Sequence, residues 1–512
     1  MTDVEVDLLV VGGGAAGLLA ATAARRLGDT VLVVERTGLA GGATLDGDGD
    51  LWLPGNQLGA KAGEDSREAA SDYLESLLGQ PVDEPSAARR TAFVRTAPKL
   101  AKWLASSNVP LHAARGAADA YPELPGARTH GRVLQVGPID RRLLGDSEDA
   151  LTPEVGLLRT TFARLPLPRR TTGPGESLVA HLLHRASANG VDLWLNATAT
   201  GLLTEGDRVV GATVEREEGV TRVAAKRVLL AAGGFGRSQA LREEYLPLPT
   251  DASWSLAGAR DDGSGLSLGR AVGAATTNLD EAWWTPVMVS GGRAYALGPA
   301  LADPHGILVD AAGDRFTDET APGDQVARAM YERSRGVRAV PSWLVMDNRH
   351  RQGCQLGPWA AGNTPKQAIE DGEVVRASTL NDLAMATGLD RAGLLGSVVR
   401  FNGFAAKGND VDFGRGEPSR DAKGKRRNAS LGKIDKPPFW AVRVYPGDAG
   451  SRGGLVTDAD SRVLRTDGSV IGGLYACPGS AASLFTGATP APGAALAESL
   501  VAAFLAVTDQ RQ

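Results

Sequence analysis

The 512-residue sequence contains no long uncharged apolar run and only two cysteines. A membrane-spanning helix needs about 18 or more consecutive apolar residues, so the sequence predicts no membrane span. Cys354 and Cys477 form no Cys-x-x-Cys pair, so neither a disulfide framework nor a zinc site is expected. The first predicted strand begins within a few residues of Met1 and leaves no room for a signal peptide, so the expected location is the cytoplasm.

An excess of positive charge is also missing. The chain has 55 lysines and arginines against 60 aspartates and glutamates, which gives a formal net charge of −5. This balance offers no basic surface for nucleic acid, and we predict no such partner. The short basic run at 423–427 is interpreted as a solvated loop.

The overall composition is that of a globular protein with many glycines. Hydrophobic residues make up 43% of the chain and charged residues 22%. The 65 glycines exceed the usual share of roughly 7%, which suits a backbone that approaches a ligand closely at several places. Because the chain is too long for one ordinary core, we expect a first domain at 1–280 and 441–512 and an inserted second domain at 281–440.

The N-terminal segment has the pattern of a doubly wound α/β sheet. Val6–Val11 is a near-continuous apolar run, as in a buried parallel strand. Ala15–Leu27 is rich in good helix formers and is followed by Gly28, and Thr30–Val34 is a second apolar strand. The order strand, turn, helix, strand is typical of a Rossmann-like domain.

Weaker patterns organise the rest of the chain. Strand character returns at 191–195, 208–215 and 227–232, whereas 116–138 has the composition of a loop. The inserted segment mixes short strands at 307–309 and 343–346 with helices around 325–333 and 378–386, which predicts an α+β domain. A helix at 494–507 closes the chain.

Three glycines after the first strand form the motif Gly-x-Gly-x-x-Gly. Gly12 permits a tight turn, Gly14 lets the backbone approach a pyrophosphate, and Gly17 allows close packing of the helix on the strand. The helix N-terminus at Ala15 presents free N–H groups to phosphates. Glu35 ends the next strand, where its carboxylate can accept hydrogen bonds from both hydroxyls of an adenosine ribose.

Three later elements favour FAD over NAD. Gly41–Thr44 supplies small residues and a hydroxyl for the pyrophosphate and ribityl chain, and the strand ending at Gly233 leaves room for a nucleotide. Residues 473–476 lead into a Gly-rich loop and the last helix, whose N-terminus would stabilise negative charge on reduced flavin. Together with the glycine motif they resemble the glutathione-reductase-type FAD fold. The predicted cofactor-binding residues are Gly12, Gly14, Ala15, Ala16, Gly17, Glu35, Arg36, Gly41, Gly42, Ala43, Thr44, Ala199, Ala232, Gly233, Gly479, Ala495 and Leu496.

Four stretches of the sequence resemble the 3-ketosteroid Δ1-dehydrogenase branch of the fumarate reductase/succinate dehydrogenase flavoprotein superfamily. They are residues 41–54, Tyr121–Gly126, Gly313–Glu319, and 473–493, and the resemblance covers nearly the whole chain. It implies a substrate domain over the flavin and the oxidation of a CH–CH bond next to a ketone. Superfamily members with covalent FAD carry a His soon after the double glycine, and none lies between 35 and 60 here, so we expect non-covalent FAD.

The resemblance also implies catalytic residues. Tyr121 matches the family's Tyr in its Tyr-Pro-Glu motif, and Gly493 matches the backbone donor to the substrate carbonyl. The carbonyl-binding Tyr of the family is replaced by Thr489, and its proton-abstracting Tyr by Gly323. Removing one preorganised oxyanion donor costs about 10²–10³ in rate, so a standard 3-ketosteroid is not expected as the substrate.

Several single residues have two interpretations. Tyr121 could instead pack against Pro122 and Pro125, and Asp46, Asp48 and Asp50 could form a solvated turn or a polar contact to substrate. Tyr295 and Tyr331 are interpreted as structural, Trp283 and Trp284 as core, and Cys477 as a buried filler.

The predicted function is an FAD-dependent dehydrogenase that introduces a C=C bond next to a carbonyl in an apolar or polycyclic ketone. Its electron acceptor would be a quinone, a dye or O₂, because no second dinucleotide motif for NAD(P)H follows. One alternative is an ene-reductase of the fumarate reductase type; Arg351 lies near a position used there, but 479–493 contains no Arg to clamp a dicarboxylate. The other is a flavin-binding protein with degenerate chemistry.

Overall fold

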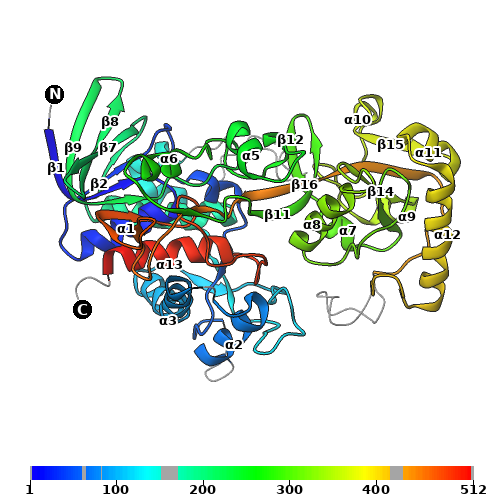
Figure 1. Ribbon diagram of the computed structural model, residues 1–512, viewed down its shortest axis with the longest axis horizontal. Coiled ribbons are helices and arrows are strands. Elements are labelled where there is room, and N and C mark those ends of the chain that lie inside the picture. Colours follow the sequence, from blue (N-terminus) through cyan, green and yellow to red (C-terminus); the bar gives the residue numbers. More distant parts are fainter. Residues whose placement is uncertain (1–2, 60–64, 82, 152–170, 416–429, 509–512) are drawn as a thin grey trace. The chain divides into compact units, whose positions relative to one another are not determined.

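The computed structural model describes residues 3–59, 65–81, 83–151, 171–415 and 430–508, and the chain forms two compact units (Figure 1). Unit 1 comprises Met1–Leu241, Gly258–Glu281 and Ser451–Gln512, and unit 2 comprises Arg242–Ala257 and Ala282–Gly450. The basic run at 423–427 lies outside the described residues.

The two units differ from the predicted domain ranges in two places. The inserted unit ends at Gly450 rather than at 440, because β16 (Phe439–Ser451) continues as a single strand. The segment 242–257 was assigned to the first domain but lies in unit 2. Arg242 pairs there with Asp448 at 2.6 Å, and neither side chain is exposed. Arg242 and Asp448 are far apart in sequence, so no local sequence pattern predicts their ion pair.

Unit 1 is built on an eight-stranded sheet in the order β18-β19-β8-β9-β1-β2-β6, with β7 beside β8. Strands β19, β9, β1, β2 and β6 run parallel. The strands are β1 (Asp3–Val11), β2 (Val31–Val34), β6 (Asp192–Trp194), β7 (Thr198–Glu205), β8 (Arg208–Arg216), β9 (Gly219–Leu230), β18 (Arg462–Leu464) and β19 (Val470–Ala476). The predicted strand–helix–strand opening and the α/β fold class are confirmed.

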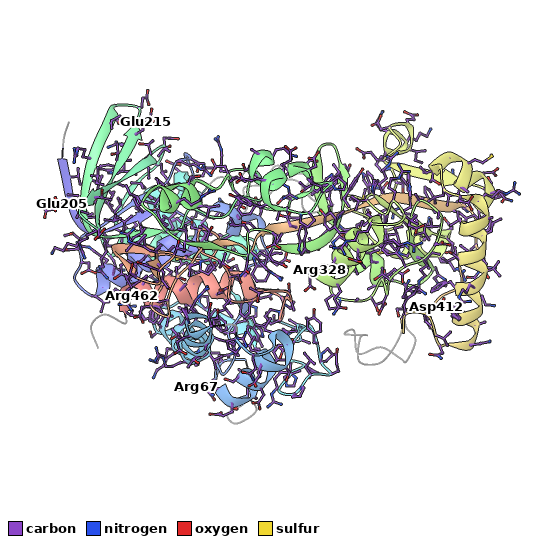
Figure 2. The ribbon with its side chains drawn as sticks, viewed as in Figure 1. Arg67, Glu205, Glu215, Arg328, Asp412 and Arg462 are labelled. Carbon is purple, nitrogen blue, oxygen red and sulfur yellow. The ribbon has the colours of Figure 1, made fainter. Side chains whose placement is uncertain are left out.

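Strand β7 was missed by the sequence reasoning. It pairs with β8 as an antiparallel hairpin, and Glu205 and Glu215, near the ends of these strands, are exposed (Figure 2). A half-exposed strand carries a mixed polar pattern, unlike β2 and the Leu8–Val11 end of β1, which are apolar and buried.

Helices cover the parallel part of the sheet. Helix α13 (Ala494–Thr508) packs against α1 (Ala15–Arg26) and α3 (Glu84–Ser106), and α4 (Pro174–Ala188) also packs against α1 (Figure 1). Both α1 and α13 are rich in alanine, and most of their residues are buried. None of the described helices combines the length and apolar character needed to cross a bilayer.

Unit 1 also contains a smaller, three-stranded sheet. Its order is β3-β5-β4, so β5 lies in the segment predicted to be a loop. The prediction was wrong there because four residues between Gly-rich turns give little strand signal. The remaining elements of unit 1 are η1 (Gly42–Asp46), β3 (Leu51–Trp52), α2 (Arg67–Leu78), β4 (Leu111–Ala113), β5 (Val133–Val136), η2 (Arg141–Ala150), α6 (Ser264–Ala271), β10 (Thr276–Thr277) and β17 (Gly454–Leu455).

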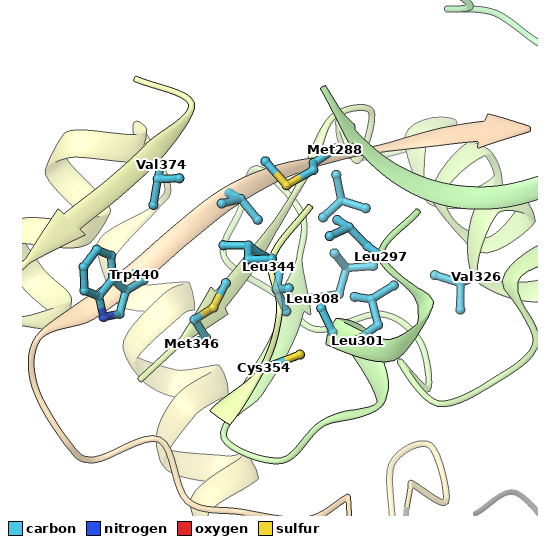
Figure 3. Packing of buried hydrophobic residues seen from close by; sticks show 14 of the residues in the cluster. Met288, Leu297, Leu301, Leu308, Val326, Leu344, Met346, Cys354, Val374 and Trp440 are labelled. Carbon is cyan, nitrogen blue, oxygen red and sulfur yellow. The ribbon is translucent and has the colours of Figure 1, made fainter. Parts of the chain in front are cut away.

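Unit 2 is an α+β layer structure around a sheet in the order β12-β11-β16-β14-β13, with β15 beside β16. One face carries Met288, Leu308, Leu344 and Met346, which pack with residues such as Leu301 and Val326 (Figure 3). The other face packs against helices α11 and α12. The elements are η3 (Ala252–Trp254), β11 (Ala282–Ser290), β12 (Arg293–Ala296), α7 (Gly298–Ala302), β13 (Gly306–Val309), α8 (Gly323–Ser334), β14 (Ser342–Met346), α9 (Asn348–Gly353), α10 (Lys366–Glu370), β15 (Val374–Ala377), α11 (Leu380–Thr387) and α12 (Arg391–Lys407), with α5 (Gln239–Tyr245) at the start.

Candidate functional site

The carboxyl ends of the parallel strands in unit 1 meet at one edge of the sheet. The N–H of Gly12 donates to the carbonyl of Val34 at 2.9 Å, and the N–H of Ala231 to that of Val11 at 2.8 Å. The N–H of Cys477, after β19, donates to the carbonyl of Leu230 at 2.9 Å. Ligands of open parallel sheets bind beyond such ends, and most predicted cofactor residues follow these strands.

Two glycines of the motif are fixed by the backbone around them. Gly12 has φ 114°, and a Cβ added there would lie 2.3 Å from the carbonyl oxygen of Ala231. A Cβ on Gly17 would lie 2.0 Å from the carbonyl oxygen of Gly12. These are the tight turn and the close helix–strand packing that the motif predicts.

Gly14 differs from its neighbours because it faces open space. The nearest atom to a Cβ there is the carbonyl oxygen of Gly41, at 3.9 Å. No side chain caps α1 at Gly14, and the first turn of the helix contains no acidic residue. The first turn of α1 therefore keeps N–H groups at the positive end of the helix dipole for an anionic group such as a pyrophosphate.

Glu35 is tied into the glycine turn. Its Oε2 accepts from the N–H of Gly13 at 2.8 Å, and its Oε1 accepts from the N–H and the hydroxyl of Thr37, each at 2.9 Å. Three of about four acceptor sites of the carboxylate are thus used by the protein. This supporting role was not foreseen, and it leaves about one acceptor site for a ribose hydroxyl. Arg36 instead pairs at the surface with Asp262 at 2.5 Å.

The loops carrying the other predicted cofactor residues are joined to this turn. The N–H of Gly41 donates to the carbonyl of Gly13 at 2.8 Å, and Gly42 and Ala43 are exposed. The hydroxyl of Ser480 accepts from the N–H of Ala232 at 3.2 Å and donates to the carbonyl of Gly233 at 3.1 Å.

Four further predicted residues have clear surroundings. A Cβ on Gly479 would lie 3.2 Å from Gly233, so these two loops touch. Thr44 lies within η1, and the described residues offer no partner to its hydroxyl. Ala16 lies in the first turn of α1, and Ala199 lies on β7, two residues after Ala197, whose N–H donates to the carbonyl of Glu35 at 2.9 Å.

The N-terminus of α13 presents unused donors. In the described ranges, no protein group accepts from the N–H of Gly493, Ala495 or Leu496. Gly493 has φ 78°, and a Cβ there would lie 2.4 Å from the carbonyl oxygen of Asp50. Glycine is therefore required where the two segments cross, and the N–H groups at the positive end of α13 can donate to a ligand.

The Tyr121 loop lies beside the loop that ends at Gly493. The carbonyl of Pro490 accepts from the N–H of Ala120 at 2.8 Å and from the hydroxyl of Tyr73 at 2.7 Å. The Tyr73 hydroxyl in turn accepts from the N–H of Tyr121 at 3.3 Å. Burial raises the pKa of Tyr73, so its phenol stays protonated. The structure thus brings together two motifs separated by more than 300 residues.

A buried ion cluster fixes the same loop. Arg132, only 1% exposed, pairs with Asp65 at 2.8 Å and with Asp119 at 2.7 Å. Asp119 also accepts from the indole N–H of Trp52 at 2.8 Å. The Arg132 guanidinium lies 5.7 Å from the centre of the Tyr73 ring. Such a cluster holds its members rigidly when all are hydrogen-bonded.

Thr489 and Asp50 both have protein partners. The hydroxyl of Thr489 accepts from Nη2 of Arg452 at 2.5 Å. Asp50 accepts from the side-chain amide of Gln135 at 2.7 Å, and burial raises the pKa of its carboxyl. Neither Arg452 nor Tyr73 was predicted from the sequence, because each acts on a distant loop without any motif of its own.

The remaining family positions lie in unit 2 and are structural. Gly323 begins α8, where a Cβ would lie 3.2 Å from Pro286. Arg315 pairs with Glu319 at 2.8 Å and with Asp410 at 2.7 Å, so the family motif at Gly313–Glu319 forms buried ion pairs inside this unit.

Arg351 and the aromatic residues of unit 2 are also engaged. Arg351 donates to the hydroxyl of Thr364 and to the carbonyls of Cys354, Ala360 and Asn363. These hydrogen bonds hold the loop at 354–364 in place. Trp284 is buried in contact with Tyr331, with ring centres 5.5 Å apart. Among the described residues, no three His, Cys, Asp or Glu side chains are grouped to hold a metal ion.

Known proteins resemble this chain along its length. The sequence model of the FAD binding domain family matches residues 7–496. A 3-oxosteroid 1-dehydrogenase of Mycobacterium tuberculosis is 31% identical, over 99% of this chain and 98% of that protein. A 4-oxocyclohex-2-ene-1-carboxylate 5-dehydrogenase of Sinomonas cyclohexanicum is also 31% identical, over 99% and 94%.

A solved structure of a related dehydrogenase is also similar to this chain. The crystal structure of 3-ketosteroid delta1-dehydrogenase from Sterolibacterium denitrificans, in complex with 1,4-androstadiene-3,17-dione, has a TM-score of 0.91 and 32% identity, over 99% of both chains. The family resemblance, the fold class and the FAD cofactor predicted from the sequence are confirmed. This chain belongs to the family of FAD-binding flavoproteins that contains the 3-oxosteroid 1-dehydrogenases.

Proposed function

We propose that this chain introduces a C=C bond next to the carbonyl of an apolar or polycyclic ketone other than a standard 3-ketosteroid. The enzyme class follows from the family: the chain is an FAD-dependent oxidoreductase that acts on CH–CH groups. The observation that carries the proposal is the hydrogen-bonded junction at Pro490, which holds the Tyr121 loop beside the donors at Thr489 and Gly493.

The residues present fit FAD. Gly14 and the uncapped start of α1 would hold the pyrophosphate, and the last acceptor site of Glu35 would take a ribose hydroxyl. The exposed residues Gly42 and Ala43 would lie along the rest of the cofactor. No His between 35 and 60 offers a covalent link, so we propose that the flavin dissociates. When bound, FAD supplies a hydride acceptor at its N5 atom.

The carbonyl end of the reaction is assigned to the loop before α13. The free N–H of Gly493 and the hydroxyl of Thr489 would donate to the carbonyl oxygen, which makes the neighbouring C–H acidic. One such donor is worth about 2.7–4 kcal/mol of transition-state stabilisation. The dipole of α13 adds positive potential from Ala495 and Leu496.

The α-proton is assigned to the side of Tyr121. Its phenol is the one acid/base group that the family motif places near the substrate, and its backbone is held by Tyr73. The α-carbon would lose its proton on the Tyr121 side, and bound FAD would supply the acceptor for the hydride of the β-carbon, so that a C=C bond joins the two carbons. Electrons would pass from the flavin to a quinone, a dye or O₂. The predicted role of unit 2 as a substrate domain remains part of this proposal.

The substrate class follows from the two replaced tyrosines. Thr489 offers an aliphatic hydroxyl where the family has a phenol, and Gly323 offers no side chain to take a proton. We therefore expect a ketone whose α-proton is acidic enough for the remaining groups.

The test mixes the flavin-loaded protein anaerobically with saturated ketones of three classes: 3-ketosteroids, neutral cyclohexanones and carboxylated cyclohexanones. The proposal predicts that one non-steroid class bleaches the flavin at least about 10²-fold faster than the steroids. A 3-ketosteroid that bleaches fastest would contradict the substrate assignment. Rapid reoxidation of reduced flavin by an enone, without bleaching by any ketone, would instead support the ene-reductase.

A further inference from the structure

Arg452 makes an unusual contact with the residue that replaces the family's carbonyl-binding tyrosine. It immediately follows β16, and its side chain is 1% exposed. Nη2 donates to the hydroxyl oxygen of Thr489 at 2.5 Å. Thr489 itself is only partly buried. A buried cation therefore lies behind a residue that is only partly buried.

The position of Arg452 is fixed on both sides of its backbone. Its N–H donates to the carbonyl of Glu281, and its carbonyl accepts from the N–H of Ser483, both at 2.8 Å. Glu498 of α13 is 2% exposed and accepts from the hydroxyl of Ser483 and the N–H of Leu484, each at 2.6 Å. The backbone of Arg452 is thus fixed at the base of the loop.

The loop that carries Thr489 is fixed at its other positions too. Pro490, the next residue, accepts two hydrogen bonds through its carbonyl, and the backbone of Gly493 lies close to that of Asp50. The Thr489 hydroxyl and the Gly493 N–H consequently belong to one preorganised segment. Donors held in this way stabilise developing charge without reorganising during the reaction.

The direction of the hydrogen bond determines what the Thr489 hydroxyl can do next. Its oxygen accepts from Arg452, which has no acceptor atom and stays charged. Its own proton remains available, since no described residue accepts from it. A donor that is itself polarised by a cation forms a stronger outward hydrogen bond, because charge-assisted bonds are roughly twice as strong as neutral ones and neighbouring bonds reinforce each other.

We propose that Arg452 is a positioning residue that makes Thr489 a charge-assisted donor to the carbonyl oxygen of the substrate, in place of a phenol. The inference rests on the proposed function, because it assumes that the carbonyl lies at Thr489 and Gly493. As the α-proton leaves, negative charge grows on the carbonyl oxygen. The chain from guanidinium N–H through the Thr489 hydroxyl to that oxygen stabilises it, and no proton is lost from Arg452 or Thr489.

The test measures oxyanion binding without turnover. The FAD-loaded protein is titrated with para-substituted phenols, whose anions resemble the enolate, and the affinity is followed through the flavin spectrum. Wild-type protein should bind phenols of lower pKa more tightly at a pH where they ionise. Arg452→Gln should weaken the binding of the ionised phenols by about 10- to 100-fold, the range for losing a hydrogen bond to a charged group. Arg452→Lys, which keeps the charge, should recover most of that loss.

A double-mutant cycle separates action through Thr489 from a general effect of charge. Thr489→Val should reduce the preference for ionised phenols to what the Gly493 N–H and the α13 dipole still supply, and Arg452→Gln should then change little in the Thr489→Val protein. Arg89→Gln is the matched control, because Arg89 lies 3.5 Å from the same Glu498 and its hydrogen bond goes to the Ala482 carbonyl rather than to Thr489. That variant should bind the phenols as the wild type does. Equal losses from Arg452→Gln with and without the Thr489→Val substitution would overturn the inference.

Two further readouts keep the result decisive. If Arg452→Gln does not retain flavin, Arg452→Met, which removes the charge but keeps a long side chain, takes its place in the cycle and is compared with and without Thr489→Val. A loss of phenol affinity caused by Arg452→Met that is the same in both proteins would overturn the inference. With any ketone that bleaches the flavin, Arg452→Gln should lower kcat more than it raises KM. A failure of the proposed function would show differently, as no bleaching by any ketone in wild-type protein.

Discussion

The hydroxyl of Tyr73 donates to the carbonyl oxygen of Pro490 over 2.7 Å. This single bond joins α2, near the start of the chain, to the loop before the last helix. The same hydroxyl oxygen of Tyr73 accepts from the N–H of Tyr121 at 3.3 Å, so one phenol connects both loops of the candidate active site. The relative placement of the catalytic groups therefore depends on a residue that has no reactive role.

Removing that hydroxyl should loosen the site more than the fold. Tyr73→Phe removes two buried hydrogen bonds and should cost about 1–3 kcal/mol of stability. We expect slower flavin reduction and faster amide exchange at Tyr121. The control is Tyr331→Phe in unit 2, which loses a longer, exposed bond of 3.3 Å to the Pro249 carbonyl. Equal amide exchange at Tyr121 in Tyr73→Phe and wild type would show that the bond is not what holds the loop.

The glycine motif and its acidic partner were predictable because they obey local sterics. Gly12 and Gly17 are required by backbone atoms a few residues or one strand away, and such needs leave a fixed spacing in the sequence. Glu35 was recognised by its position after β2, although its bonds to Gly13 and Thr37 were not. The parallel strands were likewise visible as apolar runs.

The supporting residues could not be predicted. Tyr73 and Arg452 act on residues far away in sequence, and no spacing or composition links them to Pro490 or Thr489. Arg132 similarly joins Asp65 and Asp119 only once the chain has folded.

Glu35 should matter for both cofactor affinity and the shape of the turn. Glu35→Ala removes the acceptor for Gly13 and Thr37 as well as for a ribose hydroxyl, so FAD binding should weaken by roughly 1–3 kcal/mol. Glu35→Gln, which keeps one carbonyl acceptor, should lose less. Flavin content after dialysis measures both variants. An unchanged content in Glu35→Ala would remove Glu35 from the cofactor site.

The phenol of Tyr121 is predicted to take part in proton transfer. Tyr121→Phe keeps the buried ring and should leave the flavin spectrum intact. Loss of an acid/base group should slow flavin reduction by about 10²–10⁴, whereas a packing residue would change it only a few fold. Stopped-flow bleaching with an active ketone distinguishes these outcomes. A wild-type rate would move the base to another group, and Asp50 would be the next to replace.

Asp65 in the ion cluster beside the Tyr121 loop predicts an acid-sensitive contribution to stability, whereas burial raises the pKa of Asp119 in the same cluster. Burial opposes ionisation of Asp65, but the hydrogen bond and charge of Arg132 outweigh it and lower the pKa of this carboxyl. An aspartate whose pKa is lower in the folded state stabilises the protein above its unfolded pKa of about 3.9 and loses that contribution as the pH falls further. Melting temperature measured against pH should therefore drop below about pH 4. Asp65→Asn should be less stable at neutral pH and show a shallower drop; an equally steep one would assign the acid sensitivity elsewhere.

The central claim is that this chain oxidises the CH–CH bond next to a ketone. The most direct measurement mixes flavin-loaded protein anaerobically with an excess of the best saturated ketone and follows both the flavin spectrum and the product by mass spectrometry. The flavin should bleach, and each reduced flavin should be matched by one ketone that has lost two hydrogens and gained a C=C bond beside its carbonyl. Bleaching without this product, or a product oxidised at any other position, would contradict it.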